Sequence, residues 1–266
     1  MEYVLLNFSA LAALLPASLQ AFRRVPERDA LFWVLLALAT AGPAAWVLTR
    51  TSGAWPTGFA DTLWLTIAAT MCVYVLVCMT FRDAWRLAPL VSTYMLLLGF
   101  LATSWAGVPT AHLVAGPEES DWVRAHIATT LLTYGIVTIA AIAGLAASIQ
   151  DRALKRKRPA LLSRALPSMR DCERLLFRLL VIGEGVLALG LATGIALQYS
   201  ETGALLVFNH KIVLTVAAFL VLAGLLCAYG LGGVRAKLSA RTVLVGYLLL
   251  TLGYPGVKFV TDVLMR

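Results

Sequence analysis

Residues 125–149, AHIATTLLTYGIVTIAAIAGLAASI, decide the fold class of this chain. The stretch contains no charged side chain and is longer than the roughly 20 apolar residues that a helix needs to cross a bilayer. Inside lipid, a single segment satisfies its own backbone hydrogen bonds only as an α-helix. We therefore predict a transmembrane helix here, and the rest of the sequence extends the same pattern.

Apolar runs of similar length recur along the whole chain, which is 60% hydrophobic and only 14% charged. Soluble domains carry roughly 25% charged residues, so lipid is the solvent that suits this composition. The predicted fold is all-α: a polytopic membrane bundle of about eight transmembrane helices that forms a single domain over residues 1–266. The helices are expected at about residues 3–22, 30–49, 59–81, 87–106, 125–149, 175–198, 210–231 and 242–264. The first is expected to be retained, since no basic segment precedes it as in a signal peptide.

The distribution of basic residues orients the predicted helices in the membrane. The loops after the first, third, fifth and seventh runs hold most of the 22 Lys and Arg residues. The exceptions are Arg50, Arg124, Lys211, Lys258 and Arg266. Because loops rich in Lys and Arg stay in the cytoplasm, both chain termini are expected outside. The chain is therefore predicted to cross its membrane several times.

The loop from Asp151 to Arg174 is the most strongly charged segment. Lys and Arg clusters can supply phosphate contacts to nucleic acid. This loop, however, has no aromatic residue on which a base would stack. Membrane orientation and attraction to anionic lipid explain its charge, so the lipid bilayer is a predicted partner and nucleic acid is not.

Histidine is scarce, and all three copies fall on the predicted outer side. His126 and His210 each lie in the first turn of a predicted helix, and His112 lies in the loop before His126. Two imidazoles on facing helices can bind a haem iron from both sides, while apolar helix walls hold the macrocycle. Lys211 and Lys258 lie on the same side and are candidate partners for the haem propionates.

Other interpretations of these residues stay open. Interfacial histidines often reach only to lipid headgroups, and zinc would need a fuller ligand set than the sequence offers. Thr130 and Tyr134 share the face of His126 and are expected to hold its ring or to make interhelical hydrogen bonds. Glu184 lies in the middle of a run. It is either a proton-relay or gating group, or a protonated carboxyl bonded to a neighbouring hydroxyl.

Several motifs over residues 124–266 resemble the cytochrome c assembly superfamily, and within it the YpjD/HemX-like inner-membrane subgroup. They are RAHIATTLLTYG at 124–135, QDRALKRKRP at 150–159, ALPSMRDCERLLFRL at 165–179, GLATG at 190–194, NHK at 209–211 and GYPGVKFV at 253–260. The first four predicted helices match only in hydropathy and loop length.

The resemblance implies a multi-pass protein of the bacterial inner membrane that handles haem at the outer face of that membrane. In larger members, a pair of outward histidines binds haem beside a tryptophan-rich segment, and His126 and His210 fall where that pair should be. At the place of the tryptophan-rich segment this chain reads QYSETGALLVFN, residues 198–209, without a tryptophan. The resemblance therefore implies haem binding without haem-lyase activity, with other cytochrome assembly or membrane proteins as partners.

The leading functional hypothesis is a non-enzymatic, haem-binding membrane protein. The alternative is a regulatory or scaffold subunit of another membrane complex that binds no haem, which the missing tryptophans favour. A small-solute transporter ranks last, because the sequence shows no inverted repeat and no pair of broken helices. A conventional enzyme is not expected, since the chain lacks a phosphate-binding glycine loop and an H-E-x-x-H motif.

Overall fold

Long α-helices make up most of the protein in the computed structural model. It describes residues 2–22, 27–51, 55–56, 58–106, 113–114, 121–156, 161–203, 210–232, 234 and 236–260. The long helices are α1 (Glu2–Ser18), α2 (Ala30–Thr51), α3 (Phe59–Thr80), α4 (Ala88–Ser104), α5 (Asp121–Arg156), α7 (Met169–Thr202), α8 (His210–Gly232) and α9 (Ala236–Thr251). The short elements are α6 (Leu161–Ala165), α10 (Val257–Phe259), the 3-10 turns η1 (Leu19–Phe22) and η2 (Ala84–Leu87), the π-helical turn η3 (Leu252–Gly256), and the antiparallel pair β1 (Trp55–Pro56) and β2 (Leu113–Val114).

The predicted fold class is confirmed, because the chain is a membrane-type helix bundle. Within the described residues, seven helices are long and apolar enough to cross a membrane. The first predicted span is a shorter apolar helix, Val4–Ser18, which continues as the 3-10 turn η1. Helices α5 and α7 extend well beyond their predicted ranges at both ends. Hydropathy marks only the apolar part of a helix, so their polar terminal turns escaped the prediction.

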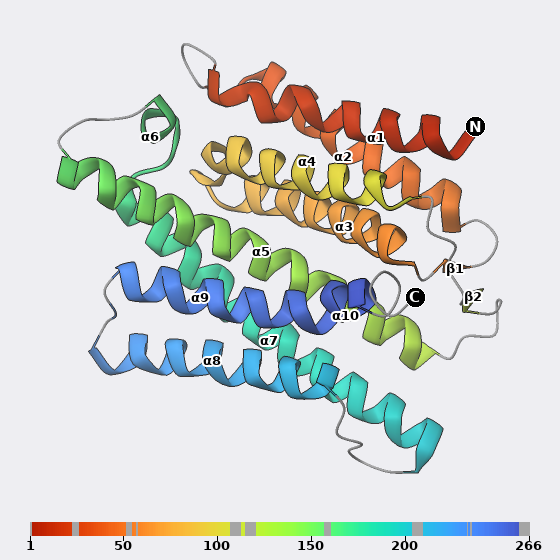
Figure 1. The fold of residues 1–266 in the computed structure, drawn as a ribbon. Helices are drawn as coiled ribbons and strands as arrows, with labels where there is room; N and C mark the ends of the chain where they lie inside the picture. The colour runs from red at the N-terminus through yellow and green to blue at the C-terminus, as the bar shows by residue number, and fades with distance from the viewer. Residues whose placement is uncertain are drawn as a thin grey trace.

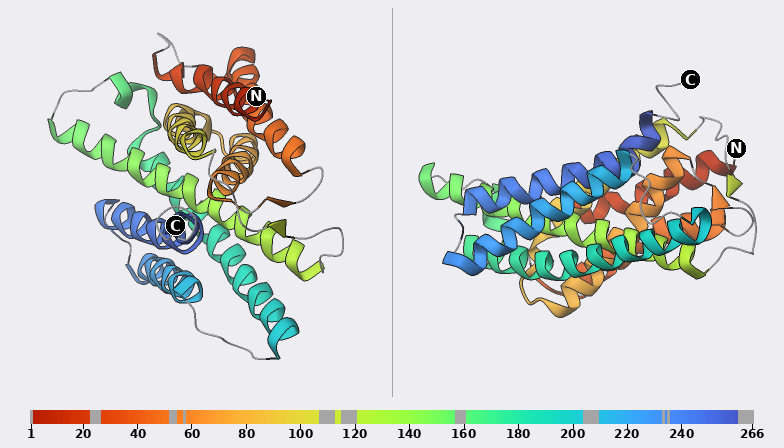
Figure 2. Two further views of the ribbon diagram at one scale, coloured as in Figure 1. Left: turned by 45° about the vertical axis from the view of Figure 1, so that its right-hand side comes forward. Right: turned by 90° about the horizontal axis from the view of Figure 1, so that it is seen from below.

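Two groups of helices lie side by side along α5. Figures 1 and 2 show α1–α4 on one side of α5, and α7, α8 and α9 on the other. Gly135 lies where α5 approaches α3. A Cβ atom at this position would be 3.2 Å from Cγ2 of Val73 and 3.4 Å from Cα of Thr70. The absence of a side chain at Gly135 therefore lets the two helix groups pack closely.

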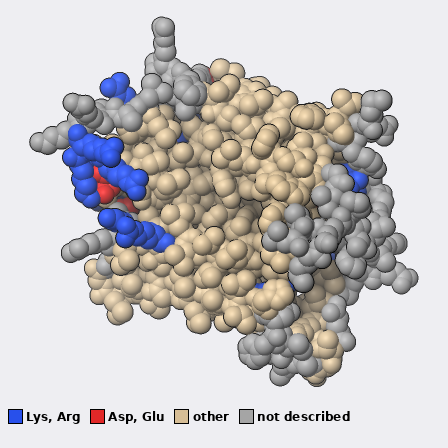
Figure 3. All heavy atoms as spheres, viewed as in Figure 1, with Lys and Arg blue, Asp and Glu red and all other residues tan. Residues whose placement is uncertain are grey.

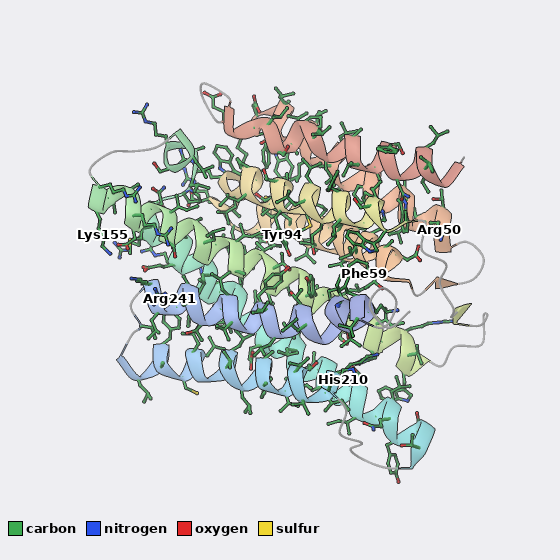
Figure 4. All side chains as sticks on the ribbon, viewed as in Figure 1. Arg50, Phe59, Tyr94, Lys155, His210 and Arg241 are labelled. Carbon is green, nitrogen blue, oxygen red and sulfur yellow. The ribbon has the colours of Figure 1, made fainter. Side chains whose placement is uncertain are left out.

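The two ends of the bundle differ in charge. At one end, which we call the basic end, α5 finishes and α7 and α9 begin; Lys and Arg side chains gather there (Figure 3) and include Lys155 and Arg241 (Figure 4). At the opposite end, which we call the histidine end, α5 and α8 begin and α7 finishes, so that His126 and His210 both lie there. The side of the membrane that each end faces stays a prediction from the basic loops.

Three tyrosine hydroxyls connect the two helix groups in the middle of the bundle. Tyr247 of α9 bonds to Tyr94 of α4, with 2.5 Å between the hydroxyl oxygens, and to Tyr134 of α5 at 2.9 Å. Tyr134 also lies 3.2 Å from Oγ1 of Thr251. Hydroxyls surrounded by apolar side chains need such partners, because an unpaired polar group is costly in this setting.

The central position of Tyr247 predicts a loss of stability when its hydroxyl is removed. Tyr247→Phe is expected to lower the unfolding free energy by about 1–3 kcal/mol, since two hydrogen bonds disappear at once. Thermal or denaturant unfolding in detergent measures the change. Tyr199→Phe is the matched control, because Tyr199 is exposed on α7. Equal stability of the two variants would contradict the prediction.

Candidate functional site

A cavity of about 480 Å³ lies between α5, α7, α8, α9 and η3, toward the histidine end. Cofactor pockets typically measure roughly 300–1,000 Å³, so the space suits a ligand of that class. Its inner wall includes the buried side chains of Leu187 and Leu250. Its rim includes the half-buried Gln198 and the exposed Thr202 and Lys211. The cavity thus offers apolar walls and a polar, positively charged rim.

The imidazole of His126 lines the cavity and is held by α7. Its Nδ1 lies 3.2 Å from the carbonyl oxygen of Gly190 and 3.3 Å from Oγ1 of Thr193. Gly194 leaves room for the ring, because a Cβ atom there would be 3.0 Å from Cε1 of His126. Two glycines and a threonine of α7 therefore form a notch that receives this side chain.

The hydrogen bond to Gly190 determines which ring nitrogen of His126 is available. A carbonyl oxygen can only accept a hydrogen bond, so Nδ1 must carry a proton. In the neutral ring, the lone pair then belongs to Nε2. Histidines that bind metals are commonly oriented in this way, with the second ring nitrogen donating to a backbone carbonyl. His126 therefore has the tautomer and the support of a metal or haem ligand.

The predicted ligand residues are only partly brought together. Lys211 lines the cavity with His126, whereas the lining does not include His210 or Lys258. His210 precedes Lys211 in the same helix, so the two side chains point about 100° apart. His210 is exposed (Figure 4), and Lys258 is half-buried and engaged with other groups. His112 lies outside the described residues.

Thr130 and Tyr134 line the cavity but do not hold the imidazole. The Thr130 hydroxyl donates within its own helix to the carbonyl oxygen of His126, at 2.7 Å. Tyr134 makes the interhelical hydrogen bonds to Tyr247 and Thr251 already described. Of the two expected roles, Tyr134 takes the interhelical one, and the Gly190 carbonyl takes the role of holding the ring.

Glu184 lies on α7 at helical spacing from Leu187 and Leu191, which both line the cavity. Both of its carboxylate oxygens are buried, and neither has a hydrogen-bond partner among the described residues. The hydrogen bond expected between Glu184 and a neighbouring hydroxyl is therefore not found within the described residues. Burial without a partner favours the neutral form of the carboxyl group. The described residues also contain no group of three His, Cys, Asp or Glu side chains that could hold a metal ion.

The role of Gly190, Thr193 and Gly194 was not predicted from the sequence, although these residues belong to the motif GLATG. Two glycines four residues apart lie on one face of a helix and mark a close approach to another helix in membranes. The two glycines predict a close contact, but they do not predict which side chain packs against them. The pairing of this motif with His126 depends on the antiparallel packing of α5 and α7, which no local pattern reveals.

Comparison with known proteins connects this arrangement to one family. The family described as "Cytochrome C assembly protein" matches residues 57–265. An uncharacterised 28.8 kDa protein of Azospirillum brasilense is 49% identical over 269 residues, which cover 99% of each chain. The inner membrane protein YpjD of Escherichia coli K12 is 28% identical over 198 residues, covering 74% of this chain and 73% of that protein. No solved structure matches this chain.

Proposed function

Because this chain belongs to the cytochrome c assembly protein family, we propose that it binds haem at the histidine end of its bundle, in the inner membrane. The observation that carries the proposal is the orientation of His126, whose Nδ1 lies 3.2 Å from the carbonyl oxygen of Gly190 beside the cavity. This contact leaves Nε2 as the ring nitrogen that would hold a haem iron. Haem would supply the iron centre that family members handle.

The properties of the cavity support haem as the ligand. Haem is a flat, largely apolar molecule with two carboxylates on one edge. The buried Leu187 and Leu250 offer apolar contacts, and the exposed ammonium group of Lys211 stands at the rim, where carboxylates would be neutralised. The lining is also rich in small side chains, such as Gly190 and Gly253, which leave room for a broad ligand.

We propose that His126 and His210 would hold the haem iron. His210 is the first residue of α8, next to the lining residue Lys211, and its exposure leaves it accessible from the rim. Lys211 is the proposed partner of one propionate, with Lys258 as a further candidate. Alanine replacement tests each assignment, because loss of an axial ligand changes the haem spectrum while loss of a lysine changes mainly the affinity.

The proposed function does not include haem-lyase activity. Residues 198–209 contain no tryptophan, whereas larger family members carry a tryptophan-rich segment at this place. The same observation favours the second candidate function, a regulatory or scaffold subunit that binds no haem. The two candidates differ in one measurable property, the affinity for haem.

An optical spectrum of the detergent-purified protein tests the proposal. After haemin is added, the protein is expected to show a Soret band that shifts on reduction with dithionite. A preparation whose spectrum stays that of free haemin would reject haem binding and leave the scaffold role. Co-purification of a stable partner that is unaffected by a His126→Ala, His210→Ala double variant would support the scaffold role.

A further inference from the structure

Helices α7 and α8 meet at the basic end of the bundle and separate toward the histidine end. At the basic end, the rings of Phe177 and Tyr229 are in contact, with 5.1 Å between their centroids. The right-hand view of Figure 2 shows the two helices separating from there toward the end where α8 begins. The cavity lies in this widening space, since residues of both helices line it.

Exposure of the lining increases along α7 from the middle of the helix toward its end. Leu187 is only 4% exposed, whereas Ile195, two turns further along, is 37% exposed. Across the space, Ile212 and Val216 of α8 also line the cavity and are half-buried. We call the part of the cavity between α7 and α8 that Ile195, Ile212 and Val216 line the α7–α8 slit.

The outer surfaces of α7 and α8 are apolar. Leu189 on α7 is 60% exposed and Val213 on α8 is 52% exposed. Exposed aliphatic side chains on helices of this length are the surface that lipid covers. Among the described lining residues, Gln198, Thr202 and Lys211 make one end of the slit polar. The slit thus has an apolar side, which suits contact with acyl chains, and a charged end, which suits contact with headgroups.

We propose that the α7–α8 slit is a lateral entrance through which the ligand enters the cavity directly from the bilayer. The ligand class is a planar amphipathic molecule with carboxylates on one edge, dissolved in the same half of the membrane. The identity of this ligand as haem rests on the proposed function. The new element is the source of the haem, which is the bilayer.

The chemistry of haem in lipid matches the two parts of the slit. A membrane-dissolved haem keeps its macrocycle among acyl chains and its carboxylates at the headgroups, as other amphipathic molecules do. If haem moves sideways between α7 and α8, its macrocycle stays in apolar surroundings as it passes Ile195. Its carboxylates stay in polar surroundings as they pass Lys211. Entry from water would instead expose the macrocycle to water before it reached the apolar wall.

A bulky side chain in the slit tests the entrance. Ile195→Trp fills the opening, whereas Leu189→Trp places the same side chain on an exposed part of α7 that does not line the cavity. Each protein is reconstituted in phosphatidylcholine vesicles, haemin is dissolved in the vesicle lipid, and the growth of the Soret band is followed. Ile195→Trp is expected to slow loading by about tenfold, and Leu189→Trp to match the unmodified protein.

A reversible cross-link provides a second test that does not depend on how tryptophan packs. The exposed Cys72 and Cys227 are first replaced with serine. Cysteines at Ile195 and Ile212 are then joined by a cleavable thiol cross-linker, which should block loading until the cross-linker is cleaved. The control joins cysteines at Phe177 and Tyr229, which already touch at the basic end, and should load normally.

The outcomes separate this proposal from the proposed function. Slow loading from vesicles by Ile195→Trp but not by Leu189→Trp, together with recovery of loading when the Ile195–Ile212 cross-linker is cleaved, supports the entrance. Unchanged loading rates with a filled and cross-linked slit, or equal slowing by both tryptophan variants, overturn it while haem binding stands. Absence of a Soret band in the unmodified protein rejects the proposed function itself.

Discussion

Replacing His126 with alanine is expected to lower haem affinity by at least about 100-fold, the largest effect of any single substitution in the chain. The variant removes the imidazole that lines the cavity and whose Nδ1 lies 3.2 Å from the Gly190 carbonyl oxygen. A Soret titration with haemin measures the affinity. The fold should persist, because the ring is only partly buried and contributes two weak hydrogen bonds to the contact between α5 and α7.

His112→Ala and His210→Ala complete this experiment. His112 has no assigned role and should leave the titration unchanged. His210→Ala, as the loss of the second proposed axial ligand, should alter the position of the Soret band with a smaller loss of affinity. If His126→Ala bound haem as well as the unmodified protein, the assignment of the cavity as the haem site would be wrong.

The second large effect is expected from Gly194→Leu, which fills the notch on α7. A Cβ atom at this position is already 3.0 Å from Cε1 of His126, and the rest of a leucine needs still more room. The imidazole must move, so its hydrogen bond to Gly190 breaks and Nε2 loses its orientation. Haem affinity is expected to fall by about 10–100-fold, and overpacking to cost about 1–3 kcal/mol of stability.

Gly185→Leu is the matched control for this substitution. Gly185 lies on the same helix, and a Cβ atom there meets no other heavy atom within 4 Å. Leucine also favours a helix over glycine by up to about 1 kcal/mol, so the control should be neutral or slightly stabilising. Similar haem affinities for the two leucine variants would show that the notch does not position His126.

The fold could be predicted from the sequence because a segment inside lipid must satisfy its own backbone hydrogen bonds. Uncharged stretches such as residues 125–149 have to be helices, so their number and order were readable from hydropathy alone. Helix lengths were not, because the apolar part of α5 ends before the helix does. Its last turn carries Lys155 and Arg156, which hydropathy assigns to a loop but which continue the helix to Arg156.

The site was predicted less completely, because it depends on the direction in which each side chain points as well as on its position along the helix. The first turns of two helices put His126 and His210 at one end of the bundle, as the structure has it. Which side chain faces the cavity depends on how each helix is rotated, and α8 is rotated so that Lys211 lines the cavity. The tyrosine chain was not foreseen either, since Tyr94 and Tyr247 meet only through tertiary packing.

Helix α9 and the turn η3 form part of the cavity wall, and their place in the chain determines when the wall is completed during synthesis. Leu250, Gly253 and Tyr254 complete the wall, and the ribosome makes them after every other lining residue. Membrane insertion proceeds from the N-terminus, so a nascent chain that has already inserted α5 and α7 presents His126 in an unfinished site. The proposed haem site is therefore complete only once α9 and η3 have joined the bundle, so haem loading would have to follow their synthesis.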